Sequence, residues 1–162
     1  SLNRSKKILD NEIKSLETRL LSLVKEEHQQ QLTNLKSIPG LGDKTAALLI
    51  VLTDGFTKFE TASQLCSFAG TTPTIRQSGS SVRGKSRISK MGNQKLRNLL
   101  FLCAFSASKY NTACRKIYER IIAKGKSKKL ALIAVINKLI KQAFAIAKSG
   151  LPYDPNYATK LN

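Results

Sequence analysis

The side chains that could perform covalent chemistry are few in this chain of 162 residues. Its single histidine, His28, excludes catalytic triads and zinc sites that need a histidine partner elsewhere in the fold, and its charged neighbours predict a solvated helix position. The three cysteines, Cys66, Cys103 and Cys114, have no CxxC spacing and predict reduced core residues of a cytosolic protein. No thiol or imidazole chemistry is indicated.

The segment 71–90 is the other stretch whose composition could serve chemistry. It is rich in serine and glycine and carries five cations without a single acid: Arg76, Arg83, Lys85, Arg87 and Lys90. Such a segment is long for an idle loop inside a compact domain, and clustered cations suit phosphate groups. A flexible linker is the alternative, but linkers rarely carry this much charge. The segment therefore predicts a functional, basic loop.

The net charge of the whole chain supports a polyanionic partner. Lys and Arg number 28 against 10 Asp and Glu, a formal charge of +18, and residues 76–162 alone hold 19 basic and two acidic side chains. The two acids, Glu119 and Asp154, are too few for a two-metal nuclease. Binding to DNA or RNA should weaken steeply with salt. An inert solubility surface and a membrane-surface patch are less favoured because the charge is segregated.

A long helix is predicted at the start of the chain, over residues 4–36. Leu9, Ile13, Leu16, Leu20 and Leu23 recur at alternating spacings of four and three, the seam of a short coiled coil. We expect residues 1–36 to serve as a dimerisation helix or an interdomain stalk, and the chain to form a homo-oligomer through residues 4–36.

A helix-hairpin-helix is predicted over residues 35–52. Pro39 ends the first helix, while Gly40 and Gly42 permit the positive φ of a tight hairpin on either side of Leu41. Backbone amides and the start of the second helix would then face a phosphate, with Lys44 beside them. An ordinary helix-helix turn is the alternative, because Pro-Gly and Gly-x-Gly are common in turns.

Helical patterns also follow the hairpin, and we assign residues 37–150 to one domain. Helices are predicted over 43–53, 61–69, 92–108, 112–124 and 128–148, with Asn111 and Ser127 as N-caps and Gly70 and Gly150 as C-caps. The last is expected to be the most buried, through Leu130, Ala134, Ile136, Leu139, Ile140, Ala143, Phe144 and Ala147. Residues 73–89 leave room for a short β-hairpin, and 151–162 form a tail.

The predicted fold class is therefore mainly α, with a long N-terminal coiled-coil helix followed by a compact helical domain. That domain contains the helix-hairpin-helix and the long basic loop. No apolar run approaches the roughly 18 to 20 residues of a bilayer span, so no membrane association is expected.

Several of these motifs together resemble a known family. Ile38–Gly42, Phe68–Pro73, Arg76–Gly79, Ile88–Asn93 and the pair Leu96 and Arg97 occur in an order that is similar to the C-terminal domain of the DEDD-type insertion-sequence transposases, related to the Piv invertase. The resemblance covers about residues 37–148. It implies a DNA transposase or recombinase in which a coiled coil joins this domain to an N-terminal RuvC-like domain that carries the acidic tetrad and Mg²⁺.

The resemblance also implies roles for individual residues. The family's serine falls on Ser78, followed by Gly79, and would attack a DNA phosphodiester to form a transient serine-DNA link. Arg76, Arg83, Lys85 and Arg87 lie close enough in sequence to neutralise the phosphate. Ser80 and Ser81 are adjacent competitors for the role. From the residues alone, a turn serine that hydrogen-bonds its own backbone is the favoured interpretation of Ser78, and only the resemblance reverses it.

The remaining candidate nucleic-acid contacts lie at the end of the segment or beyond it. They are Lys90, Lys95 and Arg97, which join the hairpin residues Pro39, Gly40, Leu41, Gly42 and Lys44. No cofactor is expected within this chain, which begins at Ser1, and Mg²⁺ is expected in a separate N-terminal domain without which the fragment would be inactive. The expected partners are double-stranded DNA and, by the resemblance, a structured noncoding RNA, in the bacterial cytoplasm at the nucleoid. The alternative function is a non-enzymatic helix-hairpin-helix module that binds DNA or RNA.

Overall fold

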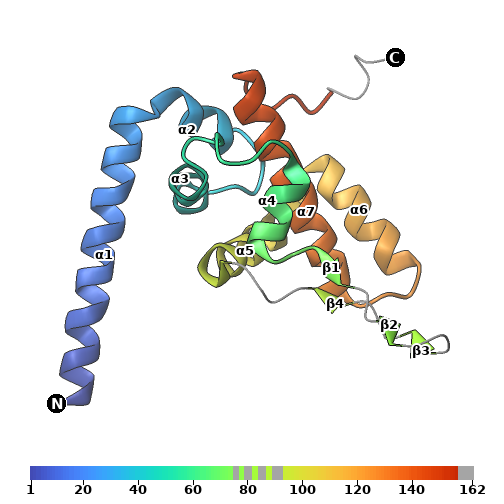
Figure 1. Ribbon diagram of the computed structural model, residues 1–162, viewed down its shortest axis with the longest axis horizontal. Helices are drawn as coiled ribbons and strands as arrows, with labels where there is room; N and C mark the ends of the chain where they lie inside the picture. Colours follow the sequence, from blue (N-terminus) through green and yellow to red (C-terminus); the bar gives the residue numbers. More distant parts are fainter. Residues whose placement is uncertain (75–76, 79–81, 84–86, 89–92, 157–162) are drawn as a thin grey trace.

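A computed structural model of the chain describes residues 1–74, 77–78, 82–83, 87–88 and 93–156. Within these ranges the fold is mainly α, as predicted (Figure 1). In chain order the elements are α1 (Leu2–Glu27), α2 (Gln29–Lys36), α3 (Asp43–Leu52), α4 (Ala62–Ala69), β1 (Pro73–Thr74), β2 (Gln77–Ser78), β3 (Val82–Arg83), β4 (Arg87–Ile88), α5 (Gln94–Tyr110), α6 (Thr112–Ala123) and α7 (Lys128–Ser149).

The core is built around α7, which packs against α2, α4, α5 and α6. Ser127 Oγ accepts a hydrogen bond from the Leu130 amide at its start, and Gly150 ends it in the left-handed conformation with φ of 70°. Along its length Val135, Ile136 and Ile140 are fully buried. Leu130 is a correction to the predicted stripe, because it is 45% exposed on the first turn, before the helix enters the core.

Helix α7 also corrects the expectation that no segment could cross a membrane. It has 22 residues and a window with mean hydropathy of 1.7, which is enough by length and composition to span a bilayer. Half of that window is nevertheless buried inside the protein. Its apolar residues are thus used by the helical core, and core helices of water-soluble domains share this composition.

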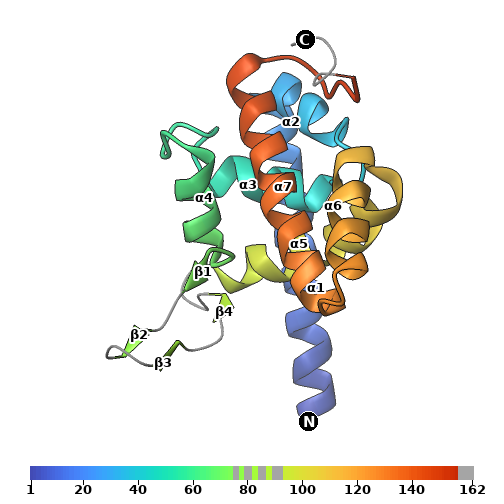
Figure 2. The same cartoon turned by 90° about the vertical axis from the view of Figure 1, so that its right-hand side faces the viewer.

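The N-terminal helix divides at His28, where the sequence predicted one helix over 4–36. His28 has φ of −129° and ψ of 36°, so the backbone changes direction there. Helix α2 then packs against α3 and α7 with Leu32 and Leu35 buried. The first half of α1 extends away from the other helices (Figures 1 and 2).

Most of the predicted coiled-coil seam of α1 lies apart from the face that contacts the domain, but the seam residue Leu20 is half-buried and lines a pocket with Leu48 and Leu99. Val24 is buried and Leu21 packs beside it, where α1 meets α2 and α3. The exposed seam side chains are Leu9, Ile13, Leu16 and Leu23, which are 57%, 49%, 65% and 47% exposed. One face of α1 therefore attaches the helix to the domain, and a neighbouring apolar face lies open.

The turn between α2 and α3 sits directly on the junction of α5 and α6. Gly40 has φ of 98°, and a Cβ atom at this position would lie 2.7 Å from the Ala107 amide nitrogen. Asn111 is fully buried; its Nδ2 donates to the Pro39 carbonyl at 3.3 Å and to Gln142 Oε1 at 2.8 Å. Its Oδ1 accepts from the Cys114 amide, which caps α6, and from Gln142 Nε2. One amide side chain thus joins the hairpin, α6 and α7.

We predict that Gly40→Ala lowers the free energy of unfolding by about 2 to 4 kcal/mol. The new Cβ would overlap the α5 backbone at Ala107. The alanine would also have to adopt a positive φ, which is unfavourable for residues with a Cβ. Gly42→Ala is the matched control, because no atom lies within 4 Å of its position, and its loss should stay below about 1 kcal/mol. Urea unfolding measures both values. Equal losses would contradict the close approach of the hairpin to α5.

Candidate nucleic-acid interface

The helix-hairpin-helix turn presents only part of its sequence to the outside. Ile38 and Leu41 are buried, Pro39 and Gly40 are half-buried, and Gly42 is exposed. Gly42 is the N-cap of α3, and no side chain caps the helix there. The amides of the first α3 turn are therefore the groups of this turn that can face an anion. Leu41, predicted as a contact residue, serves the core instead of the surface.

The predicted serine lies in a segment of paired short strands. Ser78 is in β2, whose backbone pairs antiparallel with β3 so that Ser78 is opposite Val82 and Gln77 is opposite Arg83. Strands β1 and β4 pair in the same sense and place Thr74 opposite Arg87. Figure 2 shows β2 and β3 farther from the helices than β1 and β4. Three other predicted contacts, Arg76, Lys85 and Lys90, lie outside the described residues.

Both ends of this strand segment are tied to the helical core. At its start, Thr71 is fully buried, its Oγ1 donates to Asn137 Oδ1 at 2.6 Å, and its carbonyl accepts from Asn137 Nδ2 at 3.2 Å. At its end, the Asn93 amide donates to the Phe68 carbonyl at 3.0 Å. Asn93 also caps α5 by accepting from the Leu96 amide. The segment that holds Ser78 therefore leaves from and returns to fixed points on α7, α4 and α5.

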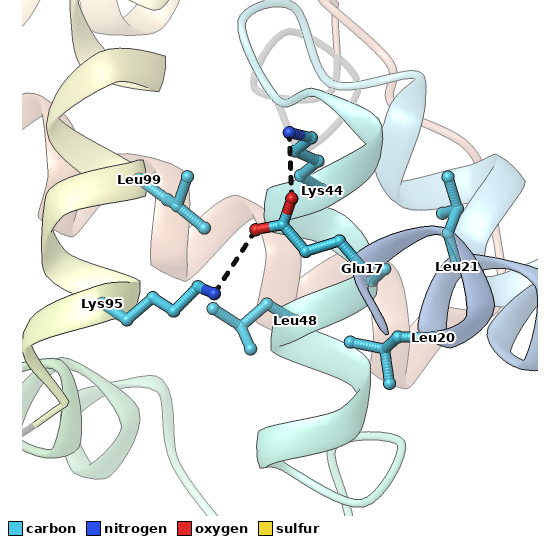
Figure 3. Close-up of a pocket in the computed structure, with 8 residues that line it drawn as sticks. Glu17, Leu20, Leu21, Lys44, Leu48, Lys95 and Leu99 are labelled. Carbon is cyan, nitrogen blue, oxygen red and sulfur yellow. Dashed lines mark hydrogen bonds and ion pairs between the residues drawn. The ribbon is translucent and has the colours of Figure 1, made fainter. Parts of the chain in front are cut away.

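Two predicted cations meet at a single acid. Lys44 Nζ of α3 lies 3.3 Å from Glu17 Oε2, and Lys95 Nζ of α5 lies 3.4 Å from Glu17 Oε1 (Figure 3). The hydrogen bond from Lys44 is the main cause that lowers the pKa of the Glu17 carboxyl, and Lys95 acts in the same direction, while partial desolvation opposes both. Glu17 is thus held as a carboxylate between α1, α3 and α5.

Arg97 lies inside the protein, which sequence reasoning did not anticipate. Only 8% of it is exposed, and its Nη1 atom has no hydrogen-bond partner in the part of the chain that the structure describes. It begins the second turn of α5, close after the Asn93 cap. A guanidinium buried in this way cannot contact a partner on the outer surface without a change of conformation. The contact of Arg97 with nucleic acid is therefore an untested prediction, and its burial does not support it.

A further group of cations was not singled out from the sequence. It lies along α6 and the turn into α7, is exposed, and consists of Arg115, Lys116, Arg120, Lys124, Lys126, Lys128 and Lys129. None of them lies within 4 Å of an acidic group among the described residues. We call these seven residues the α6 basic surface. The signal was present in the sequence, since Glu119 is the only acid between residues 76 and 153.

The structure offers little else for chemistry. The three cysteines are free and buried as predicted, and burial raises the pKa of the Cys114 thiol to about 12, so it is a poor nucleophile. Across residues 1–74 and 93–156, no group of three His, Cys, Asp or Glu side chains could hold a metal ion.

Comparison with known proteins adds an independent finding. The sequence profile described as Transposase IS116/IS110/IS902 family matches residues 32–119, from α2 to most of α6. Over 123 residues the chain is 39% identical to the pilin gene-inverting protein of Moraxella lacunata, covering 74% of this chain and 38% of that protein.

Two other relatives have a similar relation to the chain. It is 38% identical over 120 residues to an uncharacterized 43.6 kDa protein of insertion element IS110 in Streptomyces coelicolor, covering 74% of this chain and 29% of that protein. A putative transposase of Sinorhizobium fredii is 27% identical over 146 residues, covering 88% of this chain and 37% of that protein. The chain thus spans about a third of the length of the relatives it matches.

We predict that Asn137→Ala destabilises the fold by about 1 to 3 kcal/mol, because it leaves the buried Thr71 hydroxyl and carbonyl without their partner on α7. The matched control is Asn98→Ala on α5, an exposed asparagine whose replacement should change stability by less than about 0.5 kcal/mol. Thermal unfolding of both variants measures the difference. A loss in Asn137→Ala no larger than that in the control would show that the Thr71 contact does not anchor the segment.

Proposed function

The chain belongs to the IS116/IS110/IS902 transposase family, and we propose that it forms the DNA-binding and strand-exchange domain of a transposase or site-specific recombinase. The observation that carries the proposal is the strand segment containing Ser78, which is anchored at Thr71 and Asn93. This segment belongs to a strongly basic chain. The gene-inverting activity in the name of the Moraxella relative is a rearrangement of DNA, and supports this choice.

Ser78 is the proposed nucleophile. Its Oγ would attack a backbone phosphorus, so an Oγ–P bond would form while the bond from phosphorus to a deoxyribose oxygen breaks. The serine-DNA link is again a phosphodiester, so the energy of the broken bond is kept for rejoining. The basic residues on β3 and β4, Arg83 and Arg87, would stabilise the charge on the phosphate. The serine proton needs an acceptor, and the one histidine of the chain, His28, lies at the junction of α1 and α2 and belongs to neither the strand segment nor a helix next to it in sequence. The base is therefore proposed to come from outside this chain.

A metal-binding domain elsewhere in the protein is part of this proposal. The described residues offer no cluster of metal ligands, so no catalytic step within this chain is assigned to Mg²⁺. The chain spans about a third of its relatives, which leaves length for a separate acidic domain of the RuvC-like type. We propose that the isolated chain binds DNA and that strand exchange requires this second domain, in the cytoplasm at the nucleoid.

Contact with DNA is proposed at the exposed amides of the α3 start and at the cations around the strand segment. The α6 basic surface is separate from both along the chain and is exposed over its whole length. This separation favours a second polyanion, and a structured RNA is the proposed additional partner. The alternative function, a non-enzymatic module that only tethers DNA or RNA, uses the same cations and makes no demand on Ser78.

We predict that Ser78→Ala in the full-length protein abolishes strand exchange and leaves the affinity for DNA within about twofold. The substitution removes the nucleophile and no charge, so phosphate binding should persist. An assay of recombination between two DNA sites, together with fluorescence anisotropy on a labelled duplex, measures the two effects.

Ser80→Ala and Ser81→Ala are the controls, and they should recombine normally. Normal recombination by Ser78→Ala would remove the proposed nucleophile and favour the tethering module. If the chain binds DNA with no dependence on salt, the shared premise of both functions fails.

The open apolar seam of α1 is proposed to join two copies of the chain. The helix has 26 residues, and its N-terminal half makes no contact with the domain that would cover Leu9 and Ile13. A stripe of this period is stabilised when a second helix covers it.

We predict that Ile13→Ser with Leu16→Ser converts a dimer into a monomer, because both side chains are exposed and their loss affects the seam without opening the core. Sedimentation velocity measures the mass of the species. The control is Leu102→Ser with Phe105→Ser, two apolar side chains exposed on α5, which should leave the dimer intact. Dissociation in the control alone, or a monomeric wild type, would contradict self-association through α1.

A further inference from the structure

Lys44 and Lys95 converge on one anion from two different helices. Their Nζ atoms approach the two different oxygens of the Glu17 carboxylate at 3.3 Å and 3.4 Å, and the three side chains help to line a small pocket (Figure 3). The apolar side chains of Leu20, Leu48 and Leu99 also line this pocket. Each ammonium group thus binds one of the two oxygens of a single anion. A backbone phosphate also has two non-bridging oxygens, and it could bind the two ammonium groups in the same way.

The ion pairs contribute little to holding α1 in place. Exposed lysine-carboxylate pairs stabilise a fold by about 0 to 1 kcal/mol, and the lysine side chains here are 70% and 61% exposed. The buried Val24 and the adjacent Leu21 already attach α1 to the domain. The larger effect of Glu17 is electrostatic, since its single negative charge is shared by two cations on a chain with a formal charge of +18.

The position of the pair relates it to DNA contact. Lys44 is the second residue of α3: it follows Asp43, whose carboxylate pairs with Lys36, and Gly42 is the N-cap, without a side chain that caps the helix. An anion at this place would meet the helix start and the Lys44 ammonium together. Lys95 lies in the first turn of α5, two residues after Asn93 closes the strand segment. One lysine is therefore next to the start of α3 and the other is next to the end of the strand segment, the two parts of the chain that are proposed to contact DNA.

We propose that Lys44 and Lys95 form a phosphate-binding site for the backbone of double-stranded DNA, and that Glu17 occupies this site as an internal competitor. This inference rests on the proposed DNA-binding function. A phosphate that enters must displace the carboxylate from both ammonium groups. Because Glu17 belongs to α1, DNA bound at the site removes the ionic contacts of α1 with α3 and α5, and leaves the apolar contact at Val24.

The test is the affinity of the 162-residue chain for a labelled DNA duplex, measured by anisotropy over a series of salt concentrations. Glu17→Gln should bind roughly fivefold more tightly at low salt, with a slope of log affinity against log salt that is steeper by about one, since it frees a phosphate contact. Glu12→Gln is the matched control on the same helix: it makes the same charge change at an exposed acid that has no ion pair with a described residue. It should change the affinity by less than about twofold.

A second pair of variants localises the effect. Lys44→Ala with Lys95→Ala should weaken wild-type binding only slightly, because Glu17 already occupies both lysines, and should cancel the whole gain when added to Glu17→Gln. This non-additivity separates local competition from general charge repulsion. Circular dichroism of each variant confirms that the fold is kept.

Each outcome has a distinct meaning. If Glu17→Gln behaves as Glu12→Gln while the wild type binds DNA with a steep salt dependence, the competition is wrong and the proposed function stands. If the gain survives loss of both lysines, the phosphate site is elsewhere. A larger gain for an RNA hairpin of equal charge than for duplex DNA overturns the choice of DNA, and salt-independent binding by the wild type overturns the proposed function itself.

Discussion

The close approach of the hairpin backbone to α5 is the constraint on which the rest of the domain depends. Gly40 lies where a Cβ atom would overlap Ala107, so α2 and α3 can reach α5 only through a glycine. Asn111 completes the contact, because its amide is bonded at once to the hairpin, to the first turn of α6 and to Gln142 of α7. A buried amide with all its partners fixes orientation as well as position. As a result Ile38 and Leu41 turn into the core, and Gly42 and Lys44 turn outward.

The helices could be predicted from the sequence because their limits are set locally. Asn111 and Ser127 cap α6 and α7 through their own side chains, and Gly70 and Gly150 end α4 and α7 with positive φ, all within one turn of the residue concerned. The break at His28 could not be predicted in this way, because neither proline nor glycine marks it. It exists because Leu32 and Leu35 are buried against α3 and α7, and that contact depends on the whole fold.

The candidate site could be predicted in outline, since the excess of positive charge and the hairpin are visible in the sequence. Which cations are available could not be predicted. Glu17 is 27 residues from Lys44 and 78 from Lys95, and only the packing of α1 on α3, together with that of α3 on α5, brings them together. Arg97 faces inward while its neighbour Asn98 is exposed, a distinction that depends on which side of α5 meets the core. The α6 basic surface has no motif of its own, so in the sequence only the charge of residues 115–129 indicates it.

Helix α5 relates these parts to one another. The Asn93 cap ties its start to the strand segment, Lys95 in its first turn reaches Glu17, and Ala107 near its end lies under the hairpin. A helix rises about 1.5 Å per residue, so the anchor of the strand segment and the hairpin contact are separated by roughly 20 Å along a rigid rod. Under the proposed function, a nucleic acid that touches both must extend over at least that distance. The Glu17 contact lies between them, so α1 is attached at the place that such a ligand would cross.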